Sequence, residues 1–232
     1  MFQSQVDFLK QNYTVIAYDH RGQGQSEVTD GPIDMDLLTL DAAELIDKLV
    51  GKPVHFVGLS MGGFIGMRLA ARFPEKVKSL ALLETSASPE PVENFPKYKL
   101  LNGIVKWFGI IPTVARSVMK IMFAQSWLEN PKNGDAYKKW VKELQSNKKS
   151  ITKSVEAVIH RKGIEDEIRQ IKCPTMIVVG DEDVATKPEK AKFIQMSIPN
   201  SVLHVVPGAG HSSCIEKPDE INRLIGDWMR QF

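Results

Sequence analysis

Short apolar runs that alternate with helical segments constrain the fold of this chain more than any other feature. The runs are rich in valine, isoleucine and leucine, and most of them show little polar alternation, which is typical of strands covered on both faces. They span residues 14–19, 53–60, 77–84, 174–181 and 201–208. Helical patterns lie between or beside them, at roughly 2–11, 34–50, 61–73, 187–197 and 218–232. This alternation predicts an α/β fold with a mostly parallel sheet and helices on both faces.

One long region interrupts the alternation. Residues 86–172 contain no convincing strand, but they contain several segments that are amphipathic at helical spacing. We interpret this region as a helical cap inserted between the third and fourth visible strands. The expected core then consists of residues 1–85 and 173–232.

The composition is that of an ordinary globular protein and excludes several functional classes. Of the 232 residues, 43% are hydrophobic and 25% are charged. A chain of this length can form one α/β domain with a large core and an inserted subdomain. The formal net charge of +2 does not indicate a nucleic-acid partner. The lysine-rich stretch from 132 to 153 is interpreted as a solvated helical face.

Cysteine usage and hydropathy favour an intracellular setting. Cys173 and Cys214 form neither a disulfide framework nor a metal-ligand pattern, so no metal is expected. No run approaches the length of a membrane span, and the first residues lack the pattern of a secretory signal. These observations predict a cytoplasmic protein with no membrane partner.

The second run ends in a serine flanked by glycines, in the segment FVGLSMGG. Gly58, Ser60 and Gly62 match the pattern Gly-x-Ser-x-Gly between a strand and a helix, which is typical of a nucleophile elbow. Such a turn holds its serine in a strained conformation, and larger residues beside it would collide with the strand and the helix. The hydroxyl of Ser60 is then exposed, and the N–H of Met61 is placed to stabilise an oxyanion.

A serine nucleophile needs a base, and the base needs an orienting acid. His211 lies in a glycine-rich loop after the last apolar run, and Asp183 lies just after the fourth. The chain order Ser60, Asp183, His211 is the order found in α/β-hydrolases. Thr186 and Glu189 match a capping box at the start of the helix expected at 187–197.

These motifs together resemble the α/β-hydrolase superfamily, of the capped serine esterase and lactonase type. The resemblance covers essentially the whole chain and is carried by four segments: DHRGQGQS (19–26), GLSMGG (58–63), GDEDVATKP (180–188) and GAGHSSCIEKPDEI (208–221). It implies an α/β-hydrolase fold, and it implies that Asp19 and Arg21 brace their loop while Gly22 and Gly24 permit its turn. It also implies Asp183 as the acid, because Gly180 to Asp183 fits the family's Gly-x-x-Asp.

A second acid position remains open, because some relatives place the acid where Glu84 follows the third run. Asp181 and Glu182 are interpreted as solvated or structural.

The expected chemistry is cleavage of small carboxylic esters or lactones through an acyl-enzyme, without a metal or organic cofactor. Residues 183–191 resemble the corresponding loop of enol-lactonases and of lactonases acting on acylated homoserine lactones. Alternatives are a C–C bond hydrolase, a cofactor-free peroxidase, or a relative that binds a small ligand without cleaving it.

Apolar side chains of the cap are candidates for the substrate pocket. The candidates are Trp107, Met122, Phe123 and Trp127. The alternative for each is packing of the cap helices onto the core. The expected partner is a small-molecule ester or lactone substrate, and neither a nucleic acid nor a membrane is indicated.

The resemblance also implies a second oxyanion donor, in a His-Gly loop after an early strand. No His-Gly pair precedes Ser60, and residues 2–11 resemble the family's first helix. Three explanations remain: a fragment or misassigned start, a shortened enzyme with a replacement donor, or a protein that has lost catalysis. A sheet without its first strands exposes an edge. We therefore expect this edge to pair in a homodimer or to be covered by a loop.

Overall fold

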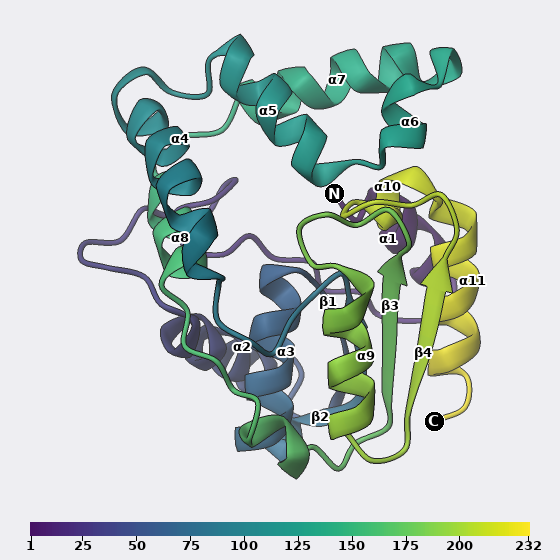
Figure 1. The fold of residues 1–232 in the computed structure, drawn as a ribbon. Coiled ribbons are helices and arrows are strands. Elements are labelled where there is room, and N and C mark those ends of the chain that lie inside the picture. The colour runs from purple at the N-terminus through teal and green to yellow at the C-terminus, as the bar shows by residue number, and fades with distance from the viewer.

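The computed structural model describes all residues from Met1 to Phe232 and contains one sheet of four strands. The strands are β1 (Val54–Leu59), β2 (Val77–Leu83), β3 (Thr175–Gly180) and β4 (Ser201–Val206). They lie in the order β1-β2-β3-β4, and each neighbouring pair is parallel. All four carboxyl ends therefore lie at one edge of the sheet. Figure 1 shows that this edge faces the layer of helices inserted between β2 and β3.

Helices cover both faces of the sheet, as the apolar runs predict. One face carries α2 (Met35–Leu49), α3 (Met61–Arg72) and α9 (Pro188–Ser197), and the other carries α1 (Gln3–Leu9) and α11 (Pro218–Met229). The side chains of β2 divide between the two layers. Leu80 and Leu82 belong to the hydrophobic cluster under α2 and α3, whereas Ala81 and Leu83 belong to the cluster under α1 and α11. This period of two buries a continuous apolar run on both faces.

The segment between β2 and β3 contains helices and no strand. The α-helices are α4 (Phe95–Phe108), α5 (Pro112–Met122), α6 (Gln125–Glu129), α7 (Gly134–Gln145) and α8 (Ile151–Ile159). Single 3-10 turns lie at Pro74–Lys76, Val92–Asn94, Pro131–Asn133 and Glu167–Gln170, and the short helix α10 spans Ser213–Glu216. No helix in the chain combines the length and the apolar character that crossing a bilayer requires. In Figure 1, α5, α6 and α7 form a layer above the carboxyl ends of β3 and β4.

The expected strand at 14–19 is wrong. These residues form no strand and no backbone hydrogen bond with β1. The physical reason is that no strand lies beside these residues to pair with their backbone groups, and a strand requires such a partner. Val15 and Tyr18 still pack partly against the two clusters, while Ile16 is 45% exposed. Consequently β1 is an edge strand.

Candidate active site

The backbone at Ser60 adopts a conformation that side chains rarely tolerate. Its φ is 50° and its ψ is −110°, between the last residue of β1 and the first residue of α3. A Cβ on Gly58 would lie 2.3 Å from the carbonyl oxygen of Gly62, and a Cβ on Gly63 would lie 2.5 Å from Oγ1 of Thr85. The glycines at 58 and 63 therefore allow strand and helix to meet this closely. Gly62 is not required for steric reasons, because a Cβ at this position would meet nothing within 4 Å.

Hydrogen bonds hold this turn in place from both sides. The N–H of Ser60 donates to the carbonyl of Leu83 at 2.8 Å, and the hydroxyl of Thr85 donates to the carbonyl of Ser60 at 2.9 Å. Met61 is the first residue of α3, so its N–H has no carbonyl partner within the helix. The turn thus presents a half-buried serine beside a free backbone donor at the positive end of a helix.

His211 and Asp183 meet above the carboxyl ends of β3 and β4. The distance between His211 Nδ1 and Asp183 Oδ2 is 2.9 Å, and both residues are buried. A ring nitrogen bonded to a carboxylate fixes the orientation of the imidazole, which leaves Nε2 as the nitrogen available to a second group. The structure contains no hydrogen bond between His211 and Ser60. Such bonds are often long before a substrate binds.

Asp183 is surrounded by hydrogen-bond donors from the loop that follows it. Oδ1 accepts from the N–H of Ala185 at 2.8 Å and from the N–H of Thr186 at 3.0 Å, while Oδ2 accepts from the Thr186 hydroxyl at 2.8 Å. Burial by itself raises the pKa of Asp183. The hydrogen bond and charge of His211, together with the Thr186 donors, outweigh burial and hold the pKa below its ordinary value. Asp183 is therefore a carboxylate at neutral pH.

Thr186 corrects the expected capping box. Helix α9 begins at Pro188, its N-cap residue is Lys187, and no side chain caps it. The Thr186 hydroxyl instead bonds Asp183 and lies 3.3 Å from Nδ1 of His211. The threonine hydroxyl therefore donates to a buried carboxylate and does not accept from a helix N–H, as a capping box would require.

Glu216 was not singled out by the sequence, yet it organises the histidine loop. Its Oε1 accepts from the N–H groups of Gly210 at 3.0 Å and Ser212 at 3.1 Å, the two residues that flank His211. Its Oε2 accepts from the N–H of Ala124, in the cap, at 2.8 Å. One buried carboxylate therefore joins the histidine loop to the segment that lies over it. Its only sequence signal is an acid five residues after the histidine.

Glu84, the alternative acid, lies in a different environment from Asp183. It is fully buried, and neither carboxyl oxygen has a hydrogen-bond partner. Burial raises the pKa of Glu84 well above its ordinary value, and the nearby charges of Asp183 and Glu216 add to this effect. Glu84 therefore keeps its proton to a higher pH than an ordinary glutamate, and it forms no hydrogen bond with His211.

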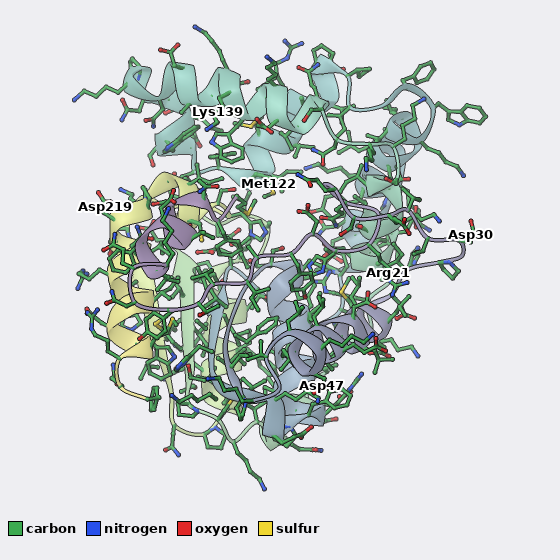
Figure 2. The ribbon with its side chains drawn as sticks, turned by 180° about the vertical axis from the view of Figure 1, so that it is seen from behind. Arg21, Asp30, Asp47, Met122, Lys139 and Asp219 are labelled. Atoms are coloured by element: carbon green, nitrogen blue, oxygen red, sulfur yellow. The ribbon has the colours of Figure 1, made fainter.

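The apolar cap residues separate into two groups. The rings of Phe123 and Trp127 are stacked with centroids 4.5 Å apart, in a buried cluster with Met119 and Ala124. Met122 is half-buried at the edge of this cluster, and Figure 2 shows it on the side of the cap that faces the core. The expectation for Trp107 is wrong, because this side chain is 74% exposed at the end of α4. The helical spacing of apolar residues in this segment did not indicate which side of α4 faces the core.

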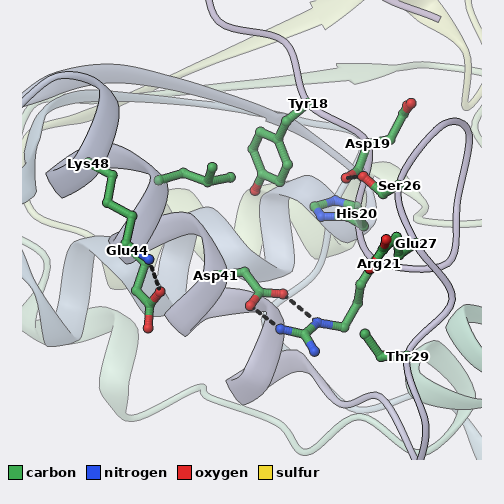
Figure 3. Close-up of a pocket in the computed structure, with 11 residues that line it drawn as sticks. Tyr18, Asp19, His20, Arg21, Ser26, Glu27, Thr29, Asp41, Glu44 and Lys48 are labelled. Carbon is green, nitrogen blue, oxygen red and sulfur yellow. Dashed lines mark hydrogen bonds and ion pairs between the residues drawn. The ribbon is translucent and has the colours of Figure 1, made fainter.

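The loop at 19–29 has the bracing role that the resemblance implies. Arg21 Nε donates to Oδ2 of Asp41 at 2.7 Å, and a second bond joins the same two side chains (Figure 3). Asp19 accepts from the N–H of Gln25 at 3.0 Å, and Gly24, with φ +48°, would place a Cβ 2.1 Å from the Asp19 carboxylate. The adjoining pocket of about 300 Å³ is lined mainly by such polar side chains and contains none of the candidate catalytic residues.

Comparisons with known proteins show the family to which this fold belongs. The profile of the alpha/beta hydrolase fold matches residues 1–218. The chain is 27% identical to 3-oxoadipate enol-lactonase 2 of Acinetobacter baylyi, over 100% of this chain and 84% of that protein.

Two solved structures have the same fold. An esterase from Thermogutta terrifontis superposes with a TM-score of 0.90 at 25% identity, over 99% of this chain and 84% of that one. The enol-lactonase from Burkholderia xenovorans gives 0.89 at 26% identity, over 99% and 85%. With the profile match over most of its length, the chain belongs to the α/β-hydrolase family.

Proposed function

We propose that this protein is a serine hydrolase that cleaves carboxylic esters or lactones of small molecules. Ser60 is the nucleophile, His211 the base and Asp183 the orienting acid. The observation that carries the proposal is the 2.9 Å bond between His211 and Asp183, both buried at the same sheet edge as the strained Ser60 turn. A strained serine and a carboxylate-bound histidine in this chain order are the parts that acyl transfer requires.

The mechanism follows from the protonation states. His211 Nε2 takes the proton of Ser60 as its oxygen attacks the carbonyl carbon, and Asp183 stabilises the imidazolium that forms. His211 then protonates the leaving alcohol oxygen, and an acyl-enzyme remains. In the second half, His211 activates water, which releases the acid and restores Ser60. The low pKa of Asp183 suits this role, because the acid must remain charged throughout.

The oxyanion receives one assigned donor, the N–H of Met61. Removing one of two such donors typically slows an enzyme on the order of 10²–10³-fold. Turnover is therefore expected even if no second backbone donor contributes. The presence of only one assigned oxyanion donor also favours a second candidate function, in which the protein binds a small ligand and hydrolyses it slowly or not at all.

The substrate class rests on the relatives and on the cap. The similar proteins include an enol-lactonase and an esterase, which favours small esters and lactones over C–C bonds or peroxidation. The proposal treats residues 86–172 as a cap over a core of residues 1–85 and 173–232. Met122 is its candidate substrate contact, whereas Phe123 and Trp127 shape the site by packing within the cap.

The deciding experiment compares the wild-type protein with Ser60→Ala on short-chain p-nitrophenyl esters and a small lactone. We expect the substitution to reduce kcat on the order of 10⁴-fold or more. A fluorophosphonate should also label Ser60, as located by mass spectrometry, and Ser117→Ala on α5 is the matched control. Wild-type turnover that survives Ser60→Ala refutes the proposal, and tight substrate binding without turnover supports the ligand-binding alternative.

We also propose that the protein forms a homodimer through the edge of β1. This strand pairs only with β2, so a row of its backbone N–H and C=O groups has no partner in the sheet. Its residues 54–57 are only half-buried, unlike the fully buried residues of β3. Pairing with a second copy would satisfy these groups.

A further inference from the structure

The charge of this protein is distributed very unevenly. Residues 97–153 contain 12 of the 30 basic residues but only 3 of the 28 acidic ones, a net charge of +9. The rest of the chain, with 18 basic and 25 acidic residues, has a net charge of −7. The overall charge of +2 therefore conceals a basic segment, residues 97–153, in a chain that is otherwise acidic. Such asymmetry points to an anionic partner for the basic part.

The basic groups of the cap are free to bind that partner. Among these twelve residues, only Lys138 forms an ion pair, with Asp135 at 3.3 Å. Eleven of them are exposed, which leaves Lys153 as the one half-buried member. The exposed members are Lys97, Lys99, Lys106, Arg116, Lys120, Lys132, Lys138, Lys139, Lys142, Lys148 and Lys149. Ordinary protein surfaces intersperse both signs of charge, and this one does not.

Large apolar side chains project from the same region. Trp107 and Phe108, at the end of α4, are each 74% exposed, Leu100 is 67% exposed and Ile111 is 36% exposed. We call these four residues the apolar tip. Figure 1 shows that the turn between α4 and α5 lies at an outer corner of the cap, away from the sheet. No other part of the chain exposes two adjacent aromatic side chains to this degree.

Lysines lie beside the aromatic pair of the apolar tip. Lys106 precedes Trp107, and the Lys149 ammonium donates to the carbonyl oxygen of Trp107 at 2.5 Å. This bond places the linker between α7 and α8, with Lys148 beside it, next to the aromatic pair. An aromatic pair with lysines beside it fits the boundary between lipid headgroups and acyl chains, where tryptophan is favoured and lysine reaches acidic headgroups.

We propose that the cap docks peripherally on a lipid bilayer that contains anionic headgroups. The apolar tip inserts at the headgroup level, and the lysines bind the surface electrostatically. The phosphates of a nucleic acid would bind the lysines, but they would leave the apolar side chains of Leu100 and Ile111 in water. A lipid surface would contact both the lysines and these apolar side chains. The lysines alone predict a solvated face, and the exposure of Trp107 and Phe108 beside them is visible only in the structure.

The test uses the full chain carrying Ser60→Ala, so that docking is measured without hydrolysis. Co-sedimentation is compared for vesicles of phosphatidylcholine and phosphatidylglycerol in equal amounts and for vesicles of phosphatidylcholine alone. We expect binding to the anionic vesicles that weakens as salt is added. Tryptophan emission should shift to the blue, and Trp107→Phe should remove most of that shift, because Trp127 and Trp228 are already buried at 9% and 7% exposure and Trp140 is half-buried against the cap cluster.

Two pairs of surface substitutions separate the contribution of the aromatic side chains to vesicle binding from that of the lysines. Replacing both Trp107 and Phe108 by alanine, or both Lys148 and Lys149 by glutamine, should lower vesicle binding by at least about tenfold. Lys52→Gln with Lys78→Gln on the exposed surface of the core is the matched control and should leave binding unchanged. Equal binding to neutral vesicles, no binding at low salt, or preferential binding of a single-stranded RNA oligonucleotide would overturn the proposal.

Discussion

Glu216 holds the backbone on both sides of His211. The same carboxylate accepts from the N–H groups of Gly210 and Ser212 and from that of Ala124 in the cap. The position of the imidazole therefore depends on an acid that does not touch it.

Glu216→Gln tests this positioning role. An amide offers one acceptor oxygen, so its NH₂ group must face at least one backbone N–H. We expect the free energy of unfolding to fall by about 1–3 kcal/mol, because a buried donor loses its partner. Ester hydrolysis should lose kcat by about tenfold with a smaller change in KM, since misplacement of a catalytic group affects the chemical step.

The matched control is Glu143→Gln on α7, where the carboxylate is exposed. Denaturant unfolding and steady-state kinetics should show wild-type values for this variant. Wild-type kcat in Glu216→Gln, with the unfolding midpoint unchanged, would contradict the role.

Thr186→Val tests the support of Asp183. The substitution removes the hydroxyl that donates to Oδ2 at 2.8 Å and preserves the side-chain shape. Hydrogen bonds to charged groups contribute about 1.5–3 kcal/mol, so we expect a loss of stability of that order at pH 7 and a lower kcat. Thr186→Ser keeps the hydroxyl and should retain most of both.

The pH dependence of this loss has a definite sign. The folded-state pKa of Asp183 is lowered, so its contribution to stability is present above the ordinary Asp pKa of about 3.9 and disappears as pH falls through the folded-state value. The difference in the free energy of unfolding between wild type and Thr186→Val should therefore become smaller as unfolding is measured at successively lower pH. A difference that stays constant down to strongly acidic pH would show that the valine acts through packing and not through Asp183.

The parts of the fold that the sequence predicts correctly are those set by local pattern. The runs that became β1 to β4 consist mostly of apolar residues, and their ends shift by only one or two residues. The failure at 14–19 has a non-local cause. That run has the composition of a strand, but pairing depends on a neighbour that the local residues cannot reveal.

The candidate site divides in the same way. Ser60, Asp183 and His211 could be chosen by spacing and chain order, and the structure brings the last two together. Thr186 was misassigned because its hydroxyl could satisfy either a helix N-terminus or a carboxylate, and only the fold places Asp183 within reach. Glu216 and the exposure of Trp107 depend on contacts between the core and the cap, for which neither segment carries a local signal.

The edge of β1 gives a third prediction. Sedimentation velocity at micromolar concentration should show a dimer, and amides of residues 54–58 should become more protected from hydrogen exchange as the protein concentration rises. The reason is that pairing removes the edge amides from water. The amide of Lys52, which lies in the exposed turn before β1 and donates no backbone hydrogen bond, serves as the internal control and should exchange rapidly throughout. A strict monomer whose edge amides exchange rapidly at every concentration would refute the dimer.

Glu84 gives the last prediction, which separates it from Asp183. Its pKa is raised in the folded state, so its contribution to stability is complete below the ordinary Glu pKa of about 4.3 and is lost as pH rises toward the folded-state value. Glu84→Gln removes this titration while keeping the size of the side chain. The variant should therefore gain stability relative to wild type as pH rises, by up to about 1.4 kcal/mol per pH unit within that window, and the gain should vanish near pH 4.

Activity provides the second half of this test. Glu84→Gln should keep nearly wild-type ester hydrolysis, because His211 is bonded to Asp183 and has no hydrogen bond with Glu84. Asp183→Asn, in contrast, should reduce kcat on the order of 10⁴-fold, since the wrong imidazole tautomer is then favoured. Large losses of kcat in Glu84→Gln and small ones in Asp183→Asn would assign the acid to Glu84, because only the residue that orients His211 can produce the larger loss.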